Sequence, residues 1–127
     1  MPIAPIPTTI QLQKTSRSLR LGYADGREFV LPAEYLRVLS PSAEVRGHGQ
    51  PILQTGKQEV GLTGVETAGR YALKLVFDDG HDSGLYTWAY LYQLATEQET
   101  RWQHYLDQLH TAGASRDPHT SAIRLLP

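Results

Sequence analysis

The stretch from Leu73 to Tyr92 constrains the fold more than any other part of the chain, because it predicts a strand, a tight turn, a strand and a helix in direct succession. Its first half alternates at a period of two, which is typical of a half-buried strand. Asp79-Gly80 is a turn pair, since glycine accepts the positive φ of a hairpin turn. Thr87 has the side chain of a helix N-cap, and apolar residues follow it at helical spacing. These apolar residues are Trp88, Leu91, Tyr92 and Ala95.

An earlier stretch repeats this pattern. Leu19 to Gly26 (LRLGYADG) resembles Leu73 to Gly80 (LKLVFDDG), and Tyr35-Leu36 corresponds to Tyr90-Leu91 after a one-residue slip. Both copies predict a hairpin followed by a helix. The likeness is explained either by an internal duplication or by the general appearance of any strand, Asp-Gly turn, strand and helix, since two copies fall short of a repeat array. Both explanations predict the same architecture.

The remaining segments complete an α+β fold, a compact single domain of antiparallel β-hairpins with two or three helices. Further strands are expected at residues 9–14 and 60–68, and further helices at residues 33–39 and 96–110. Pro32 is expected in the first turn of the earlier helix, and Gly113 is expected to stop the later one. We expect a flexible N-terminus at residues 1–8, one globular domain at 9–111 and a mobile tail at 112–127.

Composition narrows the classes of function. The chain has 127 residues, which suits one domain, and a net charge of −1, which gives no electrostatic case for binding nucleic acid or anionic membranes. It contains no cysteine, which excludes disulfides, thiolate metal sites and cysteine nucleophiles. No apolar run is long enough to cross a bilayer, and no secretory signal is recognisable. The expected location is therefore the cytoplasm.

Histidines are the first candidates for chemistry. There are five, and no pair has the spacing of a zinc-binding helix. His81, directly after the Asp79-Gly80 turn, suits an exposed ligand or base, or a polar turn residue that bonds the local backbone. Arg46 and His48 lie in a glycine-containing loop that could bind an anion, or could simply be a solvated connection. His48 and His81 could also meet in space and hold a metal. The remaining histidines are His104, His110 and His119.

Aromatic and serine residues give weaker indications. An aromatic group follows the second hairpin, and it predicts either core packing or, if Tyr86 and Tyr90 point outward, a surface that binds a partner. This group consists of Tyr86, Trp88, Tyr90, Tyr92 and Trp102. No serine occupies the G-x-S-x-G elbow of a nucleophile, so no positive signal indicates serine catalysis.

Three short segments carry a family resemblance. They are SPSAEVRGHG from Ser40, DGH from Asp79 and GLYTW from Gly84. In their order and spacing, the chain resembles the small bacterial proteins similar to the N-terminal domain of gamma-butyrobetaine hydroxylase, over about residues 19–94. The resemblance implies a compact β-rich domain with helices. In the hydroxylase this domain precedes an iron- and 2-oxoglutarate-dependent catalytic domain, and a similar domain accompanies P-loop iron–sulfur carrier proteins.

The resemblance also implies a zinc site and its loss. The hydroxylase domain binds zinc through a Cys-x-Cys-x-x-Cys run and a later histidine. These positions fall on Ser40, Ser42, Val45 and His81, so only the histidine is kept. Hydroxyls and a valine do not replace thiolates for zinc. No cofactor is therefore expected, and the oxygenase activity is not transferred because the catalytic domain is absent from this sequence.

The sequence thus predicts a non-enzymatic binding or protein-interaction module. Its expected contact residues are Arg46, His48, His81 and Tyr86. The resemblance implies a cytoplasmic protein partner, in iron–sulfur protein assembly or an oxidoreductase system. Nucleic acid and membranes are not expected partners. The alternative is a protein that binds a metal or a small ligand through its histidines.

Overall fold

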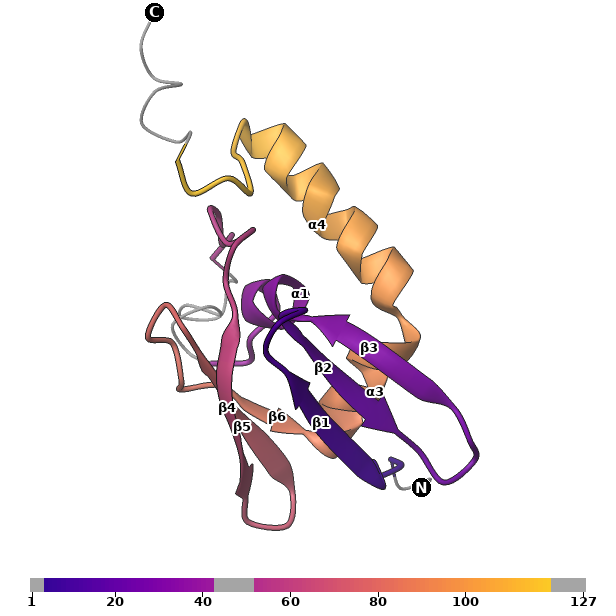
Figure 1. The fold of residues 1–127 in the computed structure, drawn as a ribbon. Coiled ribbons are helices and arrows are strands. Elements are labelled where there is room, and N and C mark those ends of the chain that lie inside the picture. Colours follow the sequence, from indigo (N-terminus) through magenta and orange to yellow (C-terminus); the bar gives the residue numbers. More distant parts are fainter. Residues whose placement is uncertain (1–3, 43–51, 120–127) are drawn as a thin grey trace, which may run out of the picture.

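The computed structural model describes residues 4–42 and 52–119 and forms an α+β domain with two small antiparallel sheets (Figure 1). Each sheet has three strands in sequence order and leads into a helix, and a longer helix follows. The first sheet contains β1 (Thr9–Gln13), β2 (Ser18–Gly22) and β3 (Glu28–Pro32), followed by α1 (Ala33–Val38). The second contains β4 (Leu62–Ala68), β5 (Ala72–Phe77) and β6 (Leu85–Thr87), followed by α3 (Trp88–Thr96) and α4 (Gln98–Ala112). The predicted fold class is confirmed.

The middle strand of each sheet supplies much of the core. In β2, Leu19 and Leu21 are fully buried, and in β5, Leu75 and Phe77 are buried. Alternation at a period of two places these side chains on one face of each sheet. The two sheets join one hydrophobic cluster, with β1 of the first sheet beside β4 of the second.

The two Asp-Gly turns have the same geometry. In each, the glycine has a φ of +90°. The Gly26 amide donates to the Tyr23 carbonyl at 3.0 Å, and the Gly80 amide donates to the Phe77 carbonyl at 3.1 Å. In the first turn the Arg27 amide donates to Asp25 Oδ1 at 3.0 Å, and in the second the His81 amide donates to Asp79 Oδ1 at 3.1 Å. The repeated sequence pattern therefore corresponds to a repeated structure.

Helix α1 lies at the centre of the molecule. All its six residues are buried, including two charged ones, Glu34 and Arg37. The last carbonyls of so short a helix are only partly satisfied by its own end, where the Leu39 and Ser40 amides donate to the Tyr35 and Arg37 carbonyls, and other elements supply further donors. The hydroxyl of Tyr86 donates to the Leu36 carbonyl at 2.5 Å, and that of Tyr90 donates to the Leu39 carbonyl at 2.5 Å.

Several element boundaries differ from the prediction. The strand expected from residue 60 begins at Leu62, beside a register irregularity between Leu62 and Gly64. The helix expected at residues 96–110 is α4, which begins at Gln98 because Glu97 breaks the helical backbone after α3 with φ −112° and ψ 23°, and which ends at Ala112. Pro32 ends β3 in an extended conformation and precedes α1. Thr87 caps α3 by accepting a hydrogen bond from the Tyr90 amide, as predicted.

The chain after α4 turns back onto the domain. Gly113 ends the helix with a φ of +64°, as its position predicted. The carbonyls of Ser115 and Arg116 then accept hydrogen bonds from the amides of Gly56 and Gln58, at 2.9 Å and 3.0 Å. Ser115 and Arg116, which belong to the predicted tail, thus have partners on the domain. Residues 120–127 of that tail lie outside the described residues.

The N-terminal segment also contacts the domain. The Thr8 amide donates to the Gly22 carbonyl at 2.7 Å, next to the buried Pro7. Within residues 4–42 and 52–119, no helix has the length and apolar character that a membrane span requires.

Candidate functional site

The second Asp-Gly turn holds the polar cluster that most resembles a site. It joins β5 to the segment before β6, and the Phe77 amide donates to the His81 carbonyl at 3.0 Å. The His81 amide donates in turn to Asp79 Oδ1 at 3.1 Å. These bonds fix the backbone of the turn, and the imidazole of His81 points inward, where it is 5% exposed.

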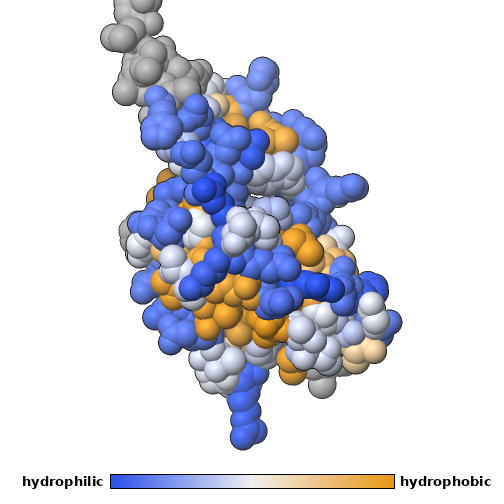
Figure 2. Space-filling model, viewed as in Figure 1, coloured by the Kyte–Doolittle hydropathy of each residue, from blue (hydrophilic) through white to orange (hydrophobic). Residues whose placement is uncertain are grey.

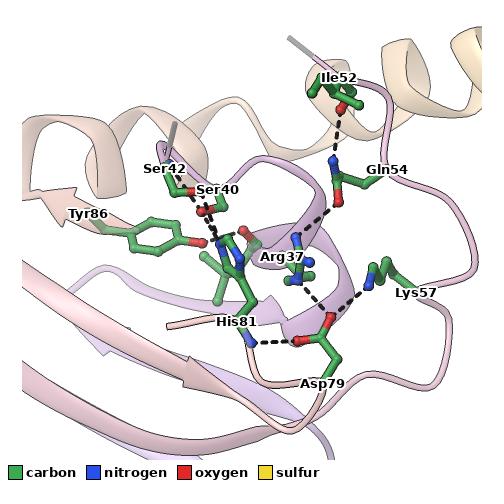
Figure 3. A network of polar contacts seen from close by, with 10 residues as sticks. Arg37, Ser40, Ser42, Ile52, Gln54, Lys57, Asp79, His81 and Tyr86 are labelled. Atoms are coloured by element: carbon green, nitrogen blue, oxygen red, sulfur yellow. Dashed lines mark hydrogen bonds and ion pairs between the residues drawn. The ribbon is translucent and has the colours of Figure 1, made fainter. Parts of the chain in front are cut away.

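Two serines from the segment after α1 meet that imidazole (Figure 3). Ser40 Oγ lies 2.9 Å from His81 Nε2, and Ser42 Oγ lies 3.3 Å from the same nitrogen. The Ser42 amide also donates to Ser40 Oγ at 3.3 Å. All three residues are buried, so these contacts tie two distant segments together away from solvent.

Asp79 accepts charged donors on its outer side. Arg37 Nε donates to Asp79 Oδ2 at 2.8 Å, and Lys57 Nζ donates to the same oxygen at 2.7 Å. Burial raises the pKa of the Asp79 carboxyl, but the hydrogen bonds from Lys57, the His81 amide and Arg37 outweigh it and lower that pKa to about 2. Asp79 therefore stays ionised at neutral pH and links α1, the loop at Lys57 and the turn.

Tyr86 closes the cluster from β6. Its ring is fully buried, and burial raises the pKa of its hydroxyl, which Ser40 partly counteracts. Tyr86 is thus a core residue, and Tyr90, with its hydroxyl on the Leu39 carbonyl, is half-buried. This resolves the open question about the aromatic group for Tyr86, which does not point outward.

The cluster has the chemistry of a structural support. A serine hydroxyl beside a histidine nitrogen is the contact that activates a nucleophile. Ser40, however, is 2% exposed, so its hydroxyl does not face dissolved substrates. Within residues 4–42 and 52–119, no three histidine, cysteine or acidic side chains gather to hold a metal ion.

The structure describes two of the four predicted contact residues, His81 and Tyr86. Arg46 and His48 fall outside the described residues, as does Val45, so the expected meeting of His48 with His81 stays a prediction. His81 and Tyr86 are described and buried, whereas an exposed contact surface was expected of them.

Sequence reasoning missed the charged partners of the site. Arg37 and Asp79 are central to the cluster, yet Asp79 was treated only as a turn residue. One signal was available, because Glu34 and Arg37 stand in a short, otherwise apolar helical segment, and buried charges are paired.

Two surface depressions lie away from this cluster. A cavity of about 530 Å³ lies between α1 and the start of α4, and Glu34, Trp102 and Arg116 contribute to its lining. There Arg116 donates to both oxygens of Glu34, at 2.8 Å and 2.7 Å, and stacks 5.1 Å from the Trp102 ring centre. A second depression of about 420 Å³, named here the Tyr71 groove, is lined by Ala4, Ile6, Arg70, Tyr71, Thr87, Trp88 and Ala89.

Comparison with known proteins places the chain among relatives of similar size. A sequence profile described as gamma-butyrobetaine hydroxylase-like, N-terminal, matches residues 10–92. No curated protein matches the chain. Among solved structures, one protein determined by NMR in solution is 58% identical, with a TM-score of 0.84, and the match covers 98% of this chain and 100% of the other. A second NMR structure is 50% identical, with a TM-score of 0.77 and coverage of 90% and 86%.

A crystal structure extends the comparison. It is a DUF971-family protein of unknown function from Acidithiobacillus ferrooxidans, 37% identical with a TM-score of 0.60, and the match covers 70% of this chain and 91% of that one.

Proposed function

The chain belongs to the gamma-butyrobetaine hydroxylase-like N-terminal family and is similar to a DUF971-family protein of unknown function, and we propose that it is a non-enzymatic protein-interaction module. The buried Ser40, Ser42 and His81 cluster gives no exposed reactive group. The Tyr71 groove carries the proposal, because it gathers exposed apolar side chains from two segments of the chain around one depression.

The Tyr71 groove is held by the backbone of the second sheet. The Trp88 indole nitrogen donates to the Arg70 carbonyl at 2.7 Å, and the Trp88 amide donates to the Tyr71 carbonyl at 3.2 Å. Tyr71 is 76% exposed and Ile6 is 52% exposed. These hydrogen bonds hold Trp88 in place as one wall of the groove, beside the exposed side chains of Tyr71 and Ile6. A partner that binds there would need to order few side chains, which lowers the entropy cost of docking.

Figure 2 shows that apolar side chains also gather elsewhere on the surface of the protein. It shows hydrophobic side chains gathered over the strands in the lower half of this face, surrounded by hydrophilic ones. Further exposed apolar side chains on the sheets are Val30 and Leu85.

Charge indicates the chemistry of the partner. Arg70 is exposed, and none of the other residues that line the groove is charged. Within residues 4–42 and 52–119, no carboxylate pairs with Arg70. The fitting occupant is a protein segment that places an apolar side chain on Trp88 and Tyr71 and a carboxylate beside Arg70. The resemblance makes a cytoplasmic iron–sulfur or oxidoreductase protein the partner that we propose.

Site-specific crosslinking tests this function. A photoreactive phenylalanine analogue replaces Tyr71 in living cells, and the same analogue at Gln103, on the exposed side of α4, is the matched control. We expect an adduct at position 71 that maps to an acidic, apolar partner segment and that Arg70→Glu reduces at least about tenfold. Equal adducts at both positions, or an adduct that Arg70→Glu leaves unchanged, would contradict the proposal.

A further inference from the structure

Two hydroxyls and one imidazole converge at the cluster of Ser40, Ser42 and His81 in an arrangement with the dimensions of a metal site. Both Oγ atoms lie near the same nitrogen, at 2.9 Å and 3.3 Å. In a tetrahedral zinc site, bond lengths of about 2.3 Å to sulfur and about 2.0 Å to nitrogen place those two ligands about 3.5 Å apart. Each hydroxyl oxygen therefore lies closer to the imidazole nitrogen than a zinc-bound sulfur would, at the distance of a hydrogen bond.

The donor set does not fit zinc. Neutral serine hydroxyls are poor ligands for this ion, which selects thiolate, imidazole and carboxylate. The resemblance assigns a cysteine to each of the two serine positions and a third to Val45, whose hydrocarbon side chain has no donor atom. In this chain the imidazole is the one conventional ligand left among the four positions.

The backbone at Gly84 packs against the Ser40 hydroxyl and leaves no room for a side chain there. A Cβ atom at Gly84 would stand 2.4 Å from Ser40 Oγ and 3.2 Å from Pro41 Cδ. The backbone at Gly84 thus lies directly against the Ser40 hydroxyl. The Ser42 amide donates to the same hydroxyl from within its own segment.

We infer that Ser40, Ser42 and His81 form a metal-free substitute for a zinc centre. Their hydrogen bonds fasten the segment after α1 to the turn after β5, which is the link that a metal shared by the same positions would supply. The native fold then needs no zinc, and this site does not store or deliver a metal to a partner. This inference does not depend on the Tyr71 groove.

Cobalt binding tests the inference by restoring the thiolates. The variant Ser40→Cys/Ser42→Cys/Val45→Cys is titrated with Co²⁺ under reducing conditions and compared with the wild-type chain. We expect the near-ultraviolet charge-transfer absorption of cobalt thiolate in the variant and none in the wild-type chain. Adding His81→Ala to the variant is expected to weaken cobalt binding by more than about tenfold, because it removes a ligand. A folded triple variant that binds no cobalt would overturn the inference.

A second measurement on the native chain covers the case in which the triple variant does not fold. The thermal midpoint of the wild-type protein is recorded with excess EDTA and with excess zinc chloride, together with its amide NMR spectrum. We expect equal midpoints and no zinc-dependent shifts at Ser40, Ser42 or His81. A higher midpoint with zinc, accompanied by saturable shifts at these residues, would show a working metal site and refute the inference.

Discussion

Tyr35 and Tyr90 make reciprocal hydrogen bonds between α1 and α3. The Tyr35 hydroxyl donates to the Leu94 carbonyl at 2.7 Å, and the Tyr90 hydroxyl donates to the Leu39 carbonyl at 2.5 Å. Leu94 stands one helical turn after Tyr90, and Leu39 stands one helical turn after Tyr35. Each tyrosine therefore satisfies a carbonyl at the end of the other helix, in the two positions that the internal repeat makes equivalent.

Removing either hydroxyl is expected to destabilise the fold. Tyr35→Phe and Tyr90→Phe should each lower the free energy of unfolding by about 1–2 kcal/mol, because a helix-end carbonyl loses its partner. Tyr35→Phe should cost more, since its bond is fully buried. Urea unfolding measures the effect. Tyr71→Phe is the control, and its exposed hydroxyl should change stability by less than about 0.5 kcal/mol. Losses no larger than this control would contradict the prediction.

The repeat itself was within reach of sequence reasoning, since its signals are local. The Asp-Gly turns, the Thr87 cap and the Gly113 stop each depend on the conformational preference of one or two residues, and all are present. The strand predicted from residue 60 began too early, since β4 begins at Leu62, beside the register shift between Leu62 and Gly64.

The candidate site was much less predictable. Contacts such as Arg37 with Asp79 join residues about forty positions apart, and only the family resemblance placed Ser40 and His81 at one site. They arise only when α1 packs against the second turn, and turn propensities and hydrophobic period do not encode that packing. His81 was therefore expected at the surface, although its imidazole is buried.

Acid is expected to weaken the Asp79 link. The pKa of Asp79 is about 2 in the folded state, below the ordinary value near 3.9, so ionised Asp79 stabilises the fold above that ordinary value. This contribution, about 1–2 kcal/mol after allowance for solvent screening, is lost as the pH falls from about 4 to about 2. The stability difference between wild type and Asp79→Asn should shrink over this range in urea unfolding.

Asp25→Asn is the matched control for Asp79→Asn. Asp25 occupies the equivalent turn, and its pKa is also lowered, mainly by the Arg27 amide, but the residue lies on the surface. Asp25→Asn should change the pH dependence of the free energy of unfolding less than Asp79→Asn does. A stability difference for Asp79→Asn that stays constant from pH 6 to about pH 2 would refute the role of its ionisation.

A side chain at Gly84 is expected to disturb the cluster. Gly84→Ala should lower the free energy of unfolding by about 1–3 kcal/mol, because the new methyl group would overlap Ser40 Oγ. The loss should be smaller in a Ser40→Ala background, where that oxygen is absent. Gly64→Ala is the control, since its nearest contact is an ordinary 3.6 Å to Val76. Identical losses in both backgrounds would show that Ser40 is not the obstacle.

Arg116 is expected to hold the returning C-terminal segment. Arg116→Ala leaves the buried Glu34 carboxylate without its bidentate partner, at a cost of about 1–3 kcal/mol. Hydrogen exchange should accelerate at the Gly56 and Gln58 amides, which donate to this segment. Arg101→Ala, which breaks an exposed pair with Glu97, should leave these amides unchanged. Unchanged exchange in Arg116→Ala would mean that the backbone bonds hold without the side chain.

The burial of α1 has a consequence for synthesis on the ribosome. A helix of six residues is far shorter than the roughly 12–15 that give even marginal helicity in water. Its hydroxyl donors, Tyr86 and Tyr90, and the guanidinium of Arg116 are translated much later than α1 itself. The first sheet therefore leaves the ribosome with its helix unformed, and the nascent chain must wait for its second half before the centre of the molecule can close.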